Sequence, residues 1–271
     1  MVKPKVLILS GYGINCEEET AFAFRKAGAS PEIVHINDLI EKNRLLRNYQ
    51  ILVFPGGFSY GDDTGAGNAL ANRIKNHLRD DLLEFIHRDK LVLGICNGFQ
   101  VLVNLGLVPA LDGQYGSRQA ALVDNTSARY LDRWVDLAFS PFPNTIKSPW
   151  TKDITRISLP IAHGEGRFYA EPEVIERIKQ KGLIAARYSR GEMCTLYNLP
   201  ANPNGSLENI AGITDKTGKV LGMMPHPERA IHYTHYPDWT ARKLELEKSG
   251  RKISEEGDGN KIFTNGVDYF R

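Results

Sequence analysis

The chain has 271 residues, with 34 basic and 32 acidic side chains and a formal net charge of +2. This balance gives no strong electrostatic field toward nucleic acid or an anionic membrane surface, so we expect neither as a partner. No apolar run approaches the roughly 20 residues that a membrane-spanning helix needs, and the three cysteines are too widely spaced for a disulfide framework or a zinc site. We therefore expect a globular cytoplasmic protein without a metal.

Short apolar runs alternate with helical patterns through the first half of the chain. Strands are predicted to begin at residues 6, 32, 51 and 91. Asn15, which precedes three glutamates, is the predicted N-cap of the first helix, and one helix of about twenty residues is predicted over 67–89. This alternation is typical of a parallel sheet that helices cover on both faces.

After about residue 115 the pattern changes. Apolar and polar residues alternate over 128–140 and 155–170, which indicates antiparallel or mixed strands. A helix is predicted over 171–182, and residues 210–230 predict a hairpin that ends at a Pro-His-Pro corner. The chain shows no repeat and no long linker, so we expect a single domain over 1–271 with a charged insertion at about 234–260.

Cys96 lies between Gly94 and Gly98, where a predicted strand gives way to a helical pattern. Taken alone, such a cysteine is more often a small buried hydrophobic residue than a nucleophile. The G-x-C-x-G spacing favours the nucleophile, because it is the thiol counterpart of a strained turn that exposes one side chain above a sheet. A helix N-terminus directly after the thiol also stabilises the reactive thiolate.

Two H-x-E stretches compete to supply the base, His163 with Glu165 and His226 with Glu228. We favour His226, because Pro227 forces it into an extended conformation, in which the side chain at i+2 points the same way. Glu228 would then orient the imidazole and stabilise its protonated form. Alone, this segment is also compatible with a charged surface turn.

The stretch PGGFSYGD, residues 55–62, follows the third predicted strand. It is compatible with an ordinary glycine-rich loop, but acyl transfer needs two N–H groups aimed at the oxyanion. We expect these from Gly57 and from Asn97, the residue after the nucleophile. Cys16 and Cys194 are interpreted as core thiols, and the Cys at position 16 also breaks a dinucleotide-binding fingerprint.

These residues resemble a known family. GINCEEE, FPGGFSYGD, VLGICNGFQVL, AHGEGRF and VLGMMPHPERA match class I (triad) glutamine amidotransferases, and more narrowly the glutaminase subunits of phosphoribosylformylglycinamidine synthases. The resemblance covers nearly the whole chain. It implies a flavodoxin-like, doubly wound mixed sheet with helices on both faces and added antiparallel strands.

The resemblance also implies site residues and partners. Cys96, His226 and Glu228 match the triad, and Gln100, His163 and Gly164 match the segment that holds the α-amino and carboxylate end of L-glutamine. The implied reaction is hydrolysis of glutamine to glutamate and ammonia through a cysteine thioester, with ammonia passed to a synthetase large subunit (PurL), often with a small bridging subunit (PurS).

No phosphate-binding motif lies in the chain, so no cofactor is expected in it, and ATP and Mg are expected on the synthetase. Two alternatives remain open, another cysteine hydrolase of similar fold (a peptidase or γ-glutamyl hydrolase) and a non-catalytic regulatory subunit. The chain departs from the compact bacterial form by extra residues around 136–152, by the insertion between Ala230 and Lys261, and by GDDTGAGN after SYG.

Overall fold

The computed structural model describes residues 3–139, 145–252 and 254–271. Its strands are β1 (Lys5–Ser10), β2 (Ser30–His35), β3 (Ile51–Phe54), β4 (Leu91–Ile95), β5 (Ala121–Val123), β6 (Leu131–Phe139), β7 (Arg156–His163), β8 (Arg167–Tyr169), β9 (Ile184–Ser189), β10 (Ile210–Thr214) and β11 (Val220–Met223). Its helices are α1 (Glu17–Lys26), α2 (Ile36–Glu41), α3 (Asn68–His77), α4 (Arg79–His87), α5 (Asn97–Asn104), α6 (Pro172–Gln180), α7 (Glu192–Leu196), α8 (Trp239–Lys248) and α9 (Asn260–Asp268). Short 3₁₀ turns include η2 (Ser59–Asp62), η4 (Pro149–Thr151) and η6 (Pro227–Arg229).

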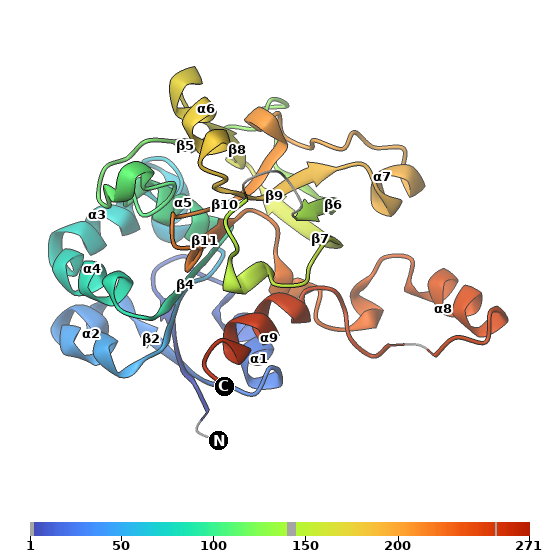
Figure 1. The fold of residues 1–271 in the computed structure, drawn as a ribbon, viewed down its shortest axis with the longest axis horizontal. Helices are drawn as coiled ribbons and strands as arrows, with labels where there is room; N and C mark the ends of the chain where they lie inside the picture. The colour runs from blue at the N-terminus through green and yellow to red at the C-terminus, as the bar shows by residue number, and fades with distance from the viewer. Residues whose placement is uncertain (1–2, 140–144, 253) are drawn as a thin grey trace.

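One large sheet runs through these residues in the order β2-β1-β3-β4-β11-β10-β9-β6-β7 (Figure 1). The pairs from β2 to β11 are parallel, and the pairs from β11 onward are antiparallel. Strands β5 and β8 form a separate antiparallel pair. The predicted fold class, a doubly wound mixed sheet with added antiparallel strands, is confirmed.

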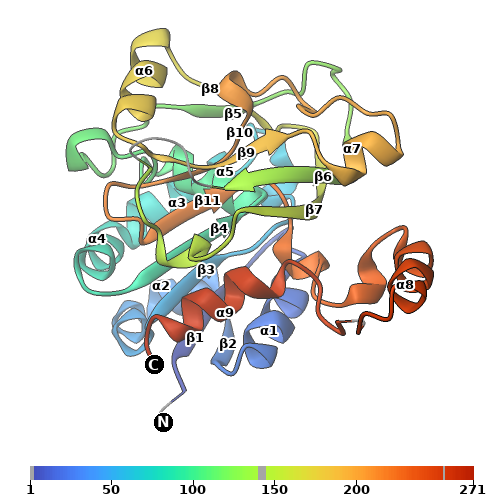
Figure 2. The ribbon, with the colours of Figure 1, turned by 45° about the vertical axis from the view of Figure 1, so that its right-hand side comes forward.

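Helices cover both faces of the parallel half (Figure 2). α1 packs with α9 on one face, and α3 packs with α5 on the other. Strands β3, β4 and β11 are buried along their whole length, which explains why their sequences are continuous apolar runs rather than alternating ones. α8 projects away from the sheet in both views, and none of its residues is buried.

The predicted single helix over 67–89 is wrong, because two helices, α3 and α4, meet at Leu78. Leu78 leaves the helical region at φ −130° and ψ 9°, yet its side chain is buried. A break of this kind keeps the apolar residues on the core side, so the 3.6-residue periodicity does not reveal it.

The predicted N-cap of the first helix is also wrong. The N-cap of α1 is Cys16, and it makes no capping hydrogen bond from its side chain. The backbone N–H of Asn15 instead donates to the carbonyl of Gly56, 3.3 Å away, in the loop after β3. A tertiary contact between two glycine-rich loops therefore sets where this helix begins.

Part of the extra segment at 136–152 lies outside the described residues, as does position 253 in the charged insertion. The described part of the insertion includes α8. No helix among the described residues has the length and apolar character to cross a lipid bilayer.

Candidate active site

Cys96 lies at the carboxyl end of β4, immediately before α5. Its backbone has φ 51° and ψ −107°, a region that costs a non-glycine residue about 1–3 kcal/mol. The Cys96 N–H donates to the carbonyl of Met223 on β11 at 2.8 Å, and Sγ lies 3.6 Å from the carbonyl oxygen of Ala162 on β7. The strained turn therefore holds the thiol among three strands, as the G-x-C-x-G spacing predicted for the backbone, but the Cys96 side chain is buried rather than exposed.

Both glycines of that spacing are required by close backbone contacts. A Cβ on Gly98 would lie 1.8 Å from the carbonyl oxygen of Phe54, at the end of β3. A Cβ on Gly94 would lie 2.6 Å from the side chain of Leu102 and 2.7 Å from the Gly98 carbonyl oxygen. Contacts this short leave no room for any side chain, so the turn can form only with glycine on both sides of Cys96.

His226 follows β11, the neighbour of β4, and is extended at φ −100° and ψ 91°. Its N–H donates to the carbonyl of Pro160 at 2.8 Å, and its Nδ1 lies 2.6 Å from Oε1 of Glu228. Both side chains are buried. The predicted pairing is correct, but the reason given for it is not, because Glu228 lies in the 3₁₀ turn η6 rather than in an extended segment.

The surroundings of His226 favour the protonated form of its imidazole. Burial alone would lower its pKa, but the Glu228 carboxylate and the nearby Cys96 and Cys16 raise it well above the ordinary value. Glu228 holds Nδ1, and Nε2 has no hydrogen-bond partner among the described residues. Nε2 is therefore the nitrogen available to exchange a proton with Cys96 or with a substrate.

The backbone N–H groups of Gly57 and Asn97 have no acceptor among the described residues. Gly57 belongs to the loop that pairs with the loop after β1, through an isolated bridge to Ile14. Asn97 is the first residue of α5, so its own N–H has no acceptor inside the helix. Both lie at the carboxyl ends of parallel strands, Gly57 after β3 and Asn97 after β4, the end at which Cys96 lies.

The competing pair, His163 and Glu165, does not form a dyad. Nδ1 of His163 lies 3.0 Å from Oδ1 of Asn125, and Oε2 of Glu165 accepts from the N–H of Ala66 at 3.1 Å. Burial, and then the nearby His226, lower the pKa of His163 to about 4, so this ring is neutral at pH 7. The carbonyl of Gly164 accepts from the N–H of Asn125, which fixes the backbone of this segment.

Gln100 lies one helical turn after Cys96 and is buried. Its Nε2 donates to the backbone carbonyl of Glu165 at 2.6 Å, and its Oε1 accepts from Nδ2 of Asn97 at 2.9 Å. The structure thus joins Gln100 to the 163–165 segment, two stretches that the sequence places 65 residues apart. The predicted substrate-binding residues lie together beside the Cys96 turn.

Cys16 is a residue of this site that the sequence interpretation missed. It is buried, as a core thiol should be, but its Sγ accepts from Nη2 of Arg229 at 3.1 Å. Ligand atoms of Cys16, His226 and Glu228 lie within 4.8 Å of one another. The positive charge of the Arg229 guanidinium, which contacts the Cys16 sulfur, would repel a metal cation bound by these three residues. Nothing near Cys16 in the sequence signals this contact, which depends on packing of the loop after β1 against the loop after β11.

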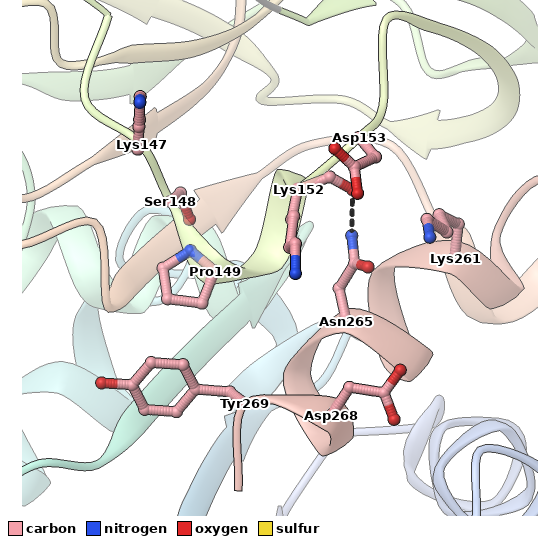
Figure 3. Close-up of a pocket in the computed structure, with 9 residues that line it drawn as sticks. All are labelled: Lys147, Ser148, Pro149, Lys152, Asp153, Lys261, Asn265, Asp268 and Tyr269. Carbon is pink, nitrogen blue, oxygen red and sulfur yellow. Dashed lines mark hydrogen bonds between the residues drawn. The ribbon is translucent and has the colours of Figure 1, made fainter. Parts of the chain in front are cut away.

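A separate cavity of about 390 Å³ lies between η4 and α9 (Figure 3). Ser148 on its wall donates to the carbonyl of Gly218, just before β11, and Tyr269 donates to Asp89, just before β4. The cavity therefore lies at the amino ends of these strands, opposite Cys96. Its lining contains no cysteine or histidine and is Lys147, Ser148, Pro149, Lys152, Asp153, Lys261, Asn265, Asp268 and Tyr269.

Comparison with known proteins gives consistent matches over the whole chain. Residues 3–270 match the family model of the CobB/CobQ-like glutamine amidotransferase domain. A Methanococcus maripaludis protein described as phosphoribosylformylglycinamidine synthase subunit PurQ is 50% identical, over 99% of this chain and 98% of the relative. A protein of the same description from Dehalococcoides mccartyi is 43% identical, over 100% and 99%. A solved structure described as PurLQS from Thermotoga maritima aligns with a TM-score of 0.71 at 27% identity, over 100% of both chains.

Proposed function

Because the chain belongs to the CobB/CobQ-like glutamine amidotransferase family, we propose that it is the glutaminase subunit of a phosphoribosylformylglycinamidine synthase and that Cys96, His226 and Glu228 are its triad. The observation that carries the assignment of residues is the strained Cys96 turn at the end of β4, with the buried His226–Glu228 pair at the end of the adjacent β11. The identity to the curated relatives supports the choice of reaction.

In the first half of the reaction, the Cys96 thiolate attacks the side-chain amide carbon of glutamine. The N–H groups of Gly57 and Asn97 donate to the oxyanion that forms. His226 then gives a proton to the departing nitrogen, ammonia leaves, and a γ-glutamyl thioester remains on Cys96. The Glu228 carboxylate holds the imidazole in place through Nδ1 and stabilises its cationic form.

In the second half, water attacks the thioester carbonyl. His226 takes the proton from water, glutamate is released, and the thiol is regenerated. Ammonia that escaped to bulk water would be protonated and no longer nucleophilic, so it must pass directly to a synthetase. We place the ATP- and Mg-dependent step on that large subunit, with a small bridging subunit in the complex, in line with the PurLQS structure that the chain resembles.

The three cysteines are free thiols, which supports a place in the reducing cytoplasm. Another cysteine hydrolase of similar fold, such as a peptidase or γ-glutamyl hydrolase, is not favoured by the relatives, which share one description.

The test is a comparison of Cys96→Ser with Cys194→Ser, a matched change at a buried thiol that contacts the carbonyl of Ser189. Glutamate release is measured with the synthetase subunits present. We expect Cys96→Ser to abolish release and Cys194→Ser to leave it within about twofold. Wild-type turnover in Cys96→Ser would eliminate the triad.

A further inference from the structure

Asp62 lies beside the end of the site where Gln100 is found, and no role has been given to it above. Nδ2 of Asn97 donates to Oε1 of Gln100 at 2.9 Å and also lies 3.4 Å from Oδ1 of Asp62. One amide group therefore connects the two side chains. The backbone carbonyl of Glu165 binds Gln100 from the other side, so Asp62, Gln100 and Glu165 surround the first turn of α5.

The backbone that leads to Asp62 is strained. Tyr60, Gly61 and Asp62 have φ of 57°, 75° and 58°, three consecutive residues in the left-handed region. Two of them are not glycine, and each costs about 1–3 kcal/mol in this conformation. Strain that persists in a loop at a candidate site, where it orients a particular side chain, is typical of function rather than of packing alone.

The Asp62 carboxylate accepts hydrogen bonds from the backbone of Gly67 and from the side chain of Asn97, but among the described residues it has no counter-ion. No Lys, Arg or His of the described residues forms an ion pair with Asp62 or Glu165. Burial, and then the neighbouring Glu165, raise the pKa of Asp62 to about 6, with Asp63 adding to the repulsion. Two carboxylates that repel each other in a half-buried place are stabilised when a cation binds between them.

The Ser59 hydroxyl is a second polar group in the same loop. The Ser59 N–H donates to Oδ1 of Asn97 at 3.4 Å, which places Ser59 against the same side chain that contacts Asp62. The Ser59 hydroxyl is buried and has no hydrogen-bond partner among the described residues. A buried hydroxyl without a partner is costly, and a polar ligand beside Asn97 would remove that cost.

Glutamine supplies a cation at the right place. In glutamine, two methylene groups separate the side-chain amide carbon, which must lie at Cys96, from the α-carbon that carries the ammonium. Gln100, four residues along α5, is about 6 Å from Cys96 along the helix axis. The α-ammonium of a substrate that extends from Cys96 along this turn therefore reaches the region of Gln100 and Asp62.

We propose that Asp62, assisted by Glu165, is the counter-ion for the α-ammonium of glutamine, and that this pair selects amides of α-amino acids over amides that lack the amino group. The inference rests on the proposed glutaminase function, which it deepens by naming the feature of the substrate that is recognised. Asp62 is a specificity-determining residue in this role, and it takes no part in bond breaking.

The experiment compares L-glutamine with glutaramate, the same amide without the α-amino group. Wild-type protein, Asp62→Asn and the neighbouring control Asp63→Asn are assayed in complex with the synthetase subunits. For Asp62→Asn we expect kcat/KM for glutamine to fall roughly 10- to 100-fold, mostly through KM, because a hydrogen bond to a charged group is lost. For glutaramate we expect a change of no more than about threefold, and Asp63→Asn should change neither substrate.

Equal losses for both substrates, or no loss for either, would overturn the proposal. Asp62→Glu, which keeps the charge, should recover part of the preference for glutamine, and its failure to do so would also count against the ammonium contact. Failure of the underlying function gives a different result, because wild-type protein would then hydrolyse neither amide in the complex.

Discussion

Replacement of Glu228 by Gln tests the electrostatic core of the mechanism. The change keeps the size of the side chain but removes the charge that lies 2.6 Å from Nδ1 of His226, in a pair that is buried on both sides. With charge centres about 4 Å apart and an effective dielectric constant of about 20, the attraction between carboxylate and imidazolium is about 4 kcal/mol. The carboxylate stabilises the imidazolium by this amount during the reaction, so its removal should lower kcat by roughly 10³-fold.

The assay is steady-state glutamate release by Glu228→Gln in complex with the synthetase, at saturating glutamine. Glu208→Gln serves as the control, since Glu208 is partly exposed and pairs with Lys179 and Arg187 on the surface. We expect the control to stay within about twofold of wild type. A Glu228→Gln enzyme that is folded, as judged by its melting temperature, and that keeps more than about a tenth of wild-type kcat would refute the role given to the carboxylate.

Four further outcomes are expected. Gly98→Ala should lower the free energy of unfolding in urea by about 3 kcal/mol because of the contact with Phe54, whereas Gly164→Ala, which meets no atom within 4 Å, should change it little; equal effects would contradict the packing argument. Asp62→Asn should raise the free energy of unfolding by about 1 kcal/mol near pH 7.5, a figure reduced for solvent screening. The folded-state pKa of about 6 lies above the ordinary value of 3.8, so this effect is complete above about pH 6, shrinks as the pH falls between the two values and is lost below about pH 3. Because the pKa of His226 is raised, kcat should decline at alkaline pH only as the imidazolium is lost, and Glu228→Gln should move that decline to lower pH; an unmoved profile would assign it to another group. Glutaminase turnover should be weak for the isolated chain and rise when the synthetase is added, and equal rates would remove the idea that the partner orders the site.

The sequence predicted those parts of the site that depend on local geometry. The glycines around Cys96 restrict the backbone within a few residues, so the strained turn could be predicted without knowing the fold. Pro227 likewise predicted the extended backbone of His226, although Glu228 then lies in a 3₁₀ turn rather than in an extended segment. The continuous apolar strands likewise indicated a parallel sheet, whose neighbouring carboxyl ends bring Cys96 and His226 to one edge.

The parts that were missed depend on contacts between distant segments. Cys16 lies beside His226 because the loops after β1 and β11 pack together across more than 200 residues of sequence, and Arg229 completes that contact. Asn15 satisfies its N–H in the loop after β3 rather than acting as a helix cap. Asp62 ends the PGGFSYGD stretch, but only the structure places its side chain next to Asn97.

The most direct test of the account is to trap the covalent intermediate. The complex with the synthetase is mixed with radiolabelled glutamine, quenched in acid within the first turnovers and digested, and the labelled peptide is identified by mass spectrometry. The account predicts a γ-glutamyl group on the peptide that contains Cys96. Label on the peptide that contains Cys16, or glutamine turnover with no covalent label, would contradict it.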